Sequence, residues 1–140
     1  MTTSFYFYCF SSRGIEPSPI EMDTGFYLHD YASGKFFENW INQRLKGWSI
    51  HSSDDVAVKD EKLDDLFRAL QDFIPYIEGQ PDHWNVVLGY RPRTTAAADK
   101  REPIVGQAKK GDIKDFATKL IDLVMRARAE EKYVQVGGGL

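Results

Sequence analysis

The chain has 140 residues, of which 42% are hydrophobic, 14% aromatic and 28% charged, and these proportions exclude wholesale disorder. This length suits one folding unit, and we expect residues 1–140 to form a single domain. Because Cys9 is the only cysteine, an intrachain disulfide and a multi-cysteine zinc site are both excluded.

The formal net charge of −3 is unevenly distributed along the chain. Residues 1–90 carry 14 acidic and 7 basic residues, whereas residues 91–140 carry 7 acidic and 11 basic residues. This asymmetry indicates a charged partner. The apolar run at residues 5–10 is too short for a signal peptide or a membrane span, so we expect a cytoplasmic protein with no membrane partner.

The first third of the chain contains two predicted strand regions. The aromatic run at residues 4–10 predicts a central strand that is covered on both faces. Residues 26–28 and 35–37 predict a hairpin with Ser33-Gly34 near its turn. Residues 38–51 stay open, because their first half fits a short helix and their second half looks extended.

A long amphipathic helix is predicted to begin near Asp60 and to end before Gly79, with Pro75 interrupting its pattern. Its apolar residues recur at intervals of three and four and form one stripe. These residues are Leu63, Leu66, Phe67, Leu70, Phe73 and Ile74.

The C-terminal part of the chain predicts a hairpin, a helix and a last strand. Residues 84–90 and 102–107 are the hairpin strands, joined by a long loop. Asp112 follows Gly111 as the expected N-cap of the second helix, and residues 133–136 form the last strand.

Together these elements predict an α+β fold, with a mixed or antiparallel sheet of five to seven strands and two main helices packed on one face. The strands at 102–107 and 133–136 are separated by the second helix. If they share a sheet, we expect them to be parallel and joined by a right-handed crossover.

An acidic stretch at residues 54–65 is the first candidate binding surface. Clustered carboxylates attract a basic partner and speed its association. The predicted partner-binding residues are Asp54, Asp55, Asp60, Glu61, Asp64 and Asp65.

A basic stretch at residues 91–110 supports an alternative, a module that binds phosphate or nucleic acid. Its candidate anion-binding residues are Arg91, Arg93, Lys100, Arg101, Lys109 and Lys110. Tyr90 is the only aromatic residue nearby, and the sequence pI is 5.6, so the sequence favours a protein partner over nucleic acid.

The three histidines support a second alternative, a small enzyme domain that binds a ligand or a metal through His29, His51 and His83. Their spacing matches no compact ligand motif, and no catalytic residue set stands out. We therefore expect a protein that is not an enzyme and that needs no metal or other cofactor.

The chain resembles bacterial immunity proteins, which neutralise the toxins of contact-dependent and polymorphic toxin systems. The resemblance rests on the small acidic chain and on three segments: the aromatic run at residues 5–10, the acidic entry Ser52-Ser53-Asp54-Asp55 ahead of the helix at 60–74, and the closing helix and strand at 112–137. It implies a protein that binds a cognate toxin domain, such as a basic nuclease, and blocks its active site.

Overall fold

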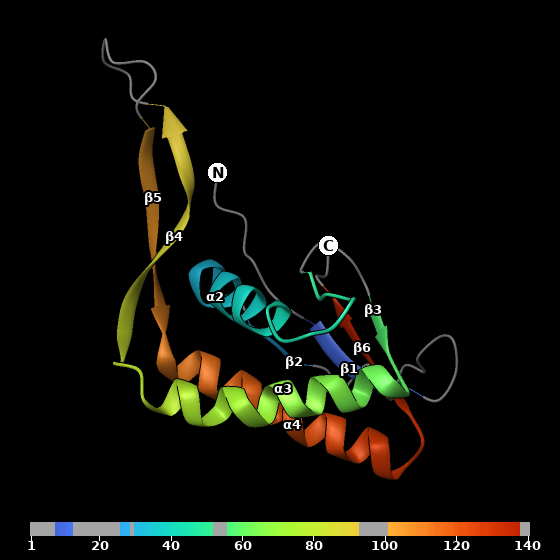
Figure 1. Ribbon diagram of the computed structural model, residues 1–140. Helices are drawn as coiled ribbons and strands as arrows, with labels where there is room; N and C mark the ends of the chain where they lie inside the picture. Colours follow the sequence, from blue (N-terminus) through green and yellow to red (C-terminus); the bar gives the residue numbers. More distant parts are fainter. Residues whose placement is uncertain (1–7, 13–25, 29, 52–55, 93–100, 138–140) are drawn as a thin grey trace.

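The computed structural model describes residues 8–12, 26–28, 30–51, 56–92 and 101–137 (Figure 1). The described elements, in chain order, are β1 (Tyr8–Ser12), β2 (Phe26–Tyr27), α2 (Tyr31–Asn42), β3 (Val56–Val58), α3 (Glu61–Glu78), β4 (His83–Pro92), β5 (Arg101–Lys109), α4 (Lys110–Ala129) and β6 (Tyr133–Gly137).

The strands form two separate sheets, which corrects the predicted single sheet of five to seven strands. One sheet has four strands in the order β2-β1-β6-β3, and the other is a two-stranded ribbon of β4 and β5. All pairings are antiparallel. The parallel crossover was expected only if residues 102–107 and 133–136 shared a sheet, and this condition is not met, because β5 and β6 belong to different sheets.

Helix α2 replaces the hairpin predicted around Ser33-Gly34. Asp30 caps this helix, and its carboxylate accepts hydrogen bonds from the backbone N–H of Ser33 at 3.0 Å and from Ser33 Oγ at 2.7 Å. Phe37 and Ile41, one turn apart, are both fully buried. A capping aspartate and this helical spacing outweigh the strand preference of the flanking aromatic residues.

Helices α3 and α4 lie side by side, and α4 packs against the four-stranded sheet (Figure 1). The helix α3 begins next to Asp60 as predicted, but it continues through Pro75 to Glu78. The helix α4 begins at Lys110, so Asp112 lies in its first turn and is not its N-cap. With α2, the described chain has three main helices and not two.

One hydrophobic core joins the three helices to the sheet. Phe73 of α3 is fully buried, and its ring centroid lies 5.4 Å from that of Phe37 and 4.8 Å from that of Trp40. Val134 and Val136 of β6 enter the same core. Among the described residues, no helix has both the length and the apolar character that crossing a bilayer requires.

The β4–β5 ribbon starts at the body and projects away from it (Figure 1). At its base, Trp84 makes an edge-to-face contact with Phe36 of α2, with ring centroids 4.9 Å apart, and Ala108 is fully buried. Gly106 packs closely on α2, since a Cβ atom there would lie 3.0 Å from Ala32 Cβ. The base of the ribbon is thus anchored on α2.

Candidate functional site

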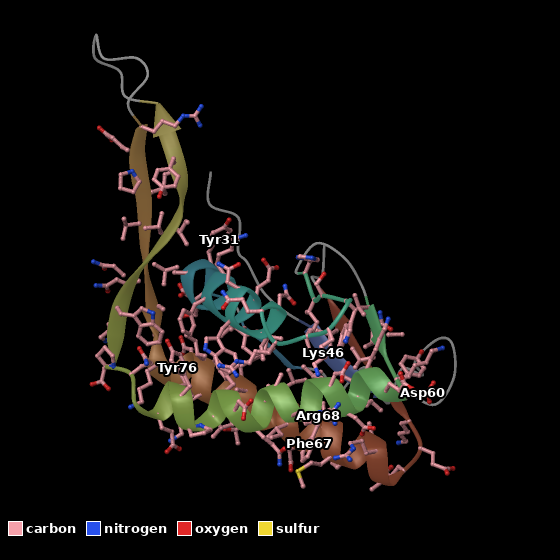
Figure 2. The ribbon with its side chains drawn as sticks, viewed as in Figure 1. Tyr31, Lys46, Asp60, Phe67, Arg68 and Tyr76 are labelled. Carbon is pink, nitrogen blue, oxygen red and sulfur yellow. The ribbon has the colours of Figure 1, made fainter. Side chains whose placement is uncertain are left out.

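The predicted acidic surface is divided in the structure. Asp60 and Glu61 lie at the start of α3, are exposed, and make no ion pair within the described chain (Figure 2). Asp54 and Asp55 lie outside the described residues. The other two predicted carboxylates, Asp64 and Asp65, both have basic partners.

Asp64 connects the two long helices. Its Oδ1 forms an ion pair with Nε of Arg128 on α4 at 3.0 Å, and the same guanidinium lies 4.5 Å above the ring of Phe67. The cation–π contact and the ion pair place Arg128 between two residues of α3. Asp64 is therefore paired with α4, although its side chain is still half exposed.

Asp65 connects α3 to the segment that follows α2. Its Oδ1 lies 2.8 Å from Nη2 of Arg68, and its Oδ2 accepts from Trp48 Nε1 at 3.3 Å. These two hydrogen bonds, with that from Arg68 the stronger, hold the pKa of Asp65 below its usual value, and the charge of Lys46 adds to the effect. Lys46, Asp65 and Arg68 line one pocket beside α3, and Figure 2 labels Lys46 and Arg68.

A groove of about 550 Å³ lies between the start of α3 and the end of α4. It is lined by Lys59, Asp60, Leu63, Asp64, Ala127, Arg128, Glu131, Lys132 and Tyr133. Asp60 and Glu131 both have a φ of 55°, which costs a residue other than glycine free energy. The charges in this groove are of both signs, so it selects no simple ion.

The structure describes two of the three histidines, His51 and His83. His29 lies outside the described residues, and His83 is exposed at the base of the ribbon, where it pairs with Lys109. No group of three or more histidine, cysteine or acidic side chains within the described ranges could hold a metal ion. His51 instead contacts Ser49 and Glu38.

The distal half of the ribbon exposes an apolar surface that the sequence analysis did not single out. Val87 pairs with Val105, and Tyr90 pairs with Pro103. These four residues, here called the ribbon face, are all exposed: Tyr90 to 62%, and Val87 and Val105 to 50% each. Such a cluster of apolar side chains is typical of an interaction surface.

A β-bulge aligns the ribbon face. Successive side chains of a strand point to opposite faces, so residues three apart, such as Val87 and Tyr90, would normally diverge. The register shifts between Val87 and Gly89, and this shift matches Val87 and Tyr90 to Val105 and Pro103, which are two residues apart. The sequence predicted a strand at 84–90 but not its bulge, although Gly89 within that strand was a signal that could have indicated one.

The basic stretch flanks the ribbon face. Arg101 and Lys109, at the two ends of β5, are exposed. Lys110 donates through Nζ to the carbonyl of Glu78 at 2.8 Å, so it helps to attach the start of α4 to the end of α3. The side chain of Arg91, and all of Arg93 and Lys100, lie outside the described part of the structure.

Comparison with known proteins gives no relative for this chain. No protein-family model matches it, and neither a curated protein nor a solved structure does.

Proposed function

We propose that this protein acts by binding another protein through the ribbon face, and that it is an immunity protein that neutralises a cognate bacterial toxin domain. The observation that carries the proposal is the exposed row of Val87, Tyr90, Pro103 and Val105 on a projecting ribbon. Burying apolar side chains that water now surrounds would favour association, and tyrosine is a common anchor of protein interfaces.

The shape of the ribbon suits insertion into a concave surface. It is two strands wide, and only its base packs on the body (Figure 1). Its edges favour docking by side chains over strand addition, because Pro103 lacks a backbone N–H and the bulge interrupts β4. A narrow apolar arm of this kind would block a toxin by filling its active-site cleft.

The test is co-expression with a toxin domain encoded by a neighbouring gene. We expect the wild-type protein to restore bacterial growth, and the combined substitutions Val87→Ser, Tyr90→Ser and Val105→Ser to abolish rescue and weaken binding by about 100-fold or more. Met125→Ser is the matched control, because Met125 is also 50% exposed but lies on α4.

Each part of the proposal can fail separately. Binding that survives the ribbon substitutions would exclude the ribbon face as the contact surface. If the wild-type protein binds the toxin domain and the ribbon substitutions weaken that binding, but growth is not restored, the ribbon is a binding surface and the immunity function is wrong.

The exposed carboxylates of Asp60 and Glu61 would add electrostatic attraction if the toxin is a basic nuclease. We expect Asp60→Lys with Glu61→Lys to slow association at low salt by about tenfold, with little change in dissociation. Asp122→Lys on α4 is the control, and equal association rates for the two variants would remove any role for the start of α3.

A further inference from the structure

We infer that Ser49 is a nucleophile, activated by His51 and Glu38, that accepts the acyl group of a small carboxylic ester. Ser49 Oγ lies 2.9 Å from His51 Nε2, and His51 Nδ1 lies 3.7 Å from Glu38 Oε2. A hydroxyl, an imidazole and a carboxylate in this order form the arrangement that activates serine in acyl transfer. The inference is independent of the proposed toxin partner.

Helix α2 fixes this group through two residues one turn apart, Glu38 and Asn42. The side chain of Asn42 holds the backbone of Ile50 at both ends: Nδ2 donates to the carbonyl at 2.8 Å, and Oδ1 accepts from the N–H at 2.8 Å. The side chain of Ile50 is buried in the core. Since side chains alternate in an extended segment, Ser49 and His51 both lie on the side away from that core.

Glu38 orients the imidazole from a buried position. It is only 6% exposed, and its other oxygen lies 3.4 Å from Lys35 Nζ. A carboxylate beside Nδ1 favours the tautomer that carries its proton on Nδ1, which leaves the lone pair of Nε2 free to accept from Ser49. The 3.7 Å separation is longer than a hydrogen bond, and such contacts commonly shorten when substrate binds.

The reaction requires only the ester and water. Ser49 Oγ attacks the carbonyl carbon while His51 Nε2 takes the hydroxyl proton; the bond to the alcohol oxygen then breaks, and the alcohol leaves with that proton. Water, deprotonated by His51, next attacks the acyl-serine, and Ser49 recovers its proton as the acid is released. His51 is about half exposed, so a small ester can reach both residues from solvent.

The experiment uses an alkyl fluorophosphonate, which forms a Ser–O–P bond and releases fluoride, on the full-length protein. We expect mass spectrometry to locate the label on Ser49 and labelling to disappear in Ser49→Ala. Thr118→Ala is the matched control, since the Thr118 hydroxyl donates to the Lys114 carbonyl on α4 at 2.7 Å. This control should label like the wild type.

The rate at which the fluorophosphonate labels Ser49 tests the roles of His51 and Glu38. His51→Gln should slow labelling of Ser49 at least 100-fold, because it removes the base that accepts the hydroxyl proton. Glu38→Gln should slow the labelling of Ser49 at least tenfold. If that variant does not fold, His51→Gln alone tests the group, since His51 is exposed. Absence of label on Ser49, or labelling of Ser49 at the wild-type rate in His51→Gln, would overturn the inference.

Discussion

Strand β6 and the β4–β5 ribbon are both rich in valine, yet they have opposite environments. β6 pairs with β1 on one side and β3 on the other, and Val134 and Val136 are fully buried. In the distal ribbon, Val87 and Val105 are half exposed. The difference shows that β-branched residues specify extended backbone, whereas burial depends on which elements pack over the strand.

The largest expected difference between body and ribbon is in stability. Phe73→Ala removes a fully buried ring that contacts Phe37 and Trp40, and it should lower the free energy of unfolding by about 3–5 kcal/mol. Val87→Ala on the ribbon should change it by less than about 0.5 kcal/mol. Urea unfolding measures both, and similar losses would mean that the ribbon packs on the body in solution.

Alanine substitutions at two glycines, Gly106 and Gly89, test how closely the base of the ribbon packs on the body. In Gly106→Ala, the new Cβ would lie 3.0 Å from Ala32 Cβ and 2.9 Å from Leu88 Cδ1. The leucine can move but the α2 backbone cannot, so we expect a loss of about 1–2 kcal/mol in urea unfolding. Gly89→Ala meets no atom within 4 Å and should be neutral or slightly stabilising. Equal effects would contradict the close packing at the base.

A smaller effect is expected where the body itself is strained. The end of α4 closes with a hydrogen bond from Lys132 N–H to the Ala127 carbonyl at 2.8 Å, and Glu131 has a φ of 55° at the position that normally favours glycine. Glu131→Gly should therefore raise the free energy of unfolding by about 1 kcal/mol, measured as a higher melting temperature. Glu130→Gly, where φ is −103°, should not, and a gain there would show that strain is not the cause.

The smallest effect is the pH dependence contributed by Asp65. Its pKa is lowered in the folded state, so its stabilising contribution is present above the unfolded pKa, about 3.9, and is lost as pH falls through the folded value. In an acid titration by NMR, the indole N–H signal of Trp48 should shift with a midpoint below that of a free aspartate, and Asp65→Asn should remove the shift. A midpoint at or above 3.9 would contradict the ion pair.

Sequence periodicity predicted the elements whose own residues carry a complete pattern. The stripe from Leu63 to Ile74 matched α3, and the hairpin predicted from residues 84–90 and 102–107 matched the ribbon strands. The prediction failed at residues 30–37, where aromatic residues suited either a strand or a helix and the cap at Asp30 decided for the helix; residues 38–42, left open between a helix and an extended segment, complete the same helix. The strand β3, with three residues, was too short for a pattern.

The candidate sites depended on contacts between distant residues. The sequence located the charges of the acidic stretch, but only the packing of α3 on α4 pairs Asp64 with Arg128. His51 was a candidate from its chemistry alone, and only the approach of residues 49–51 to α2 brings it to Glu38. Local patterns thus determined the long helices and the ribbon strands of this protein. Its strand pairing, its exposed ribbon face and its Ser–His–Glu group arise from three-dimensional contacts, because such contacts join residues whose spacing in the chain carries no periodic signal.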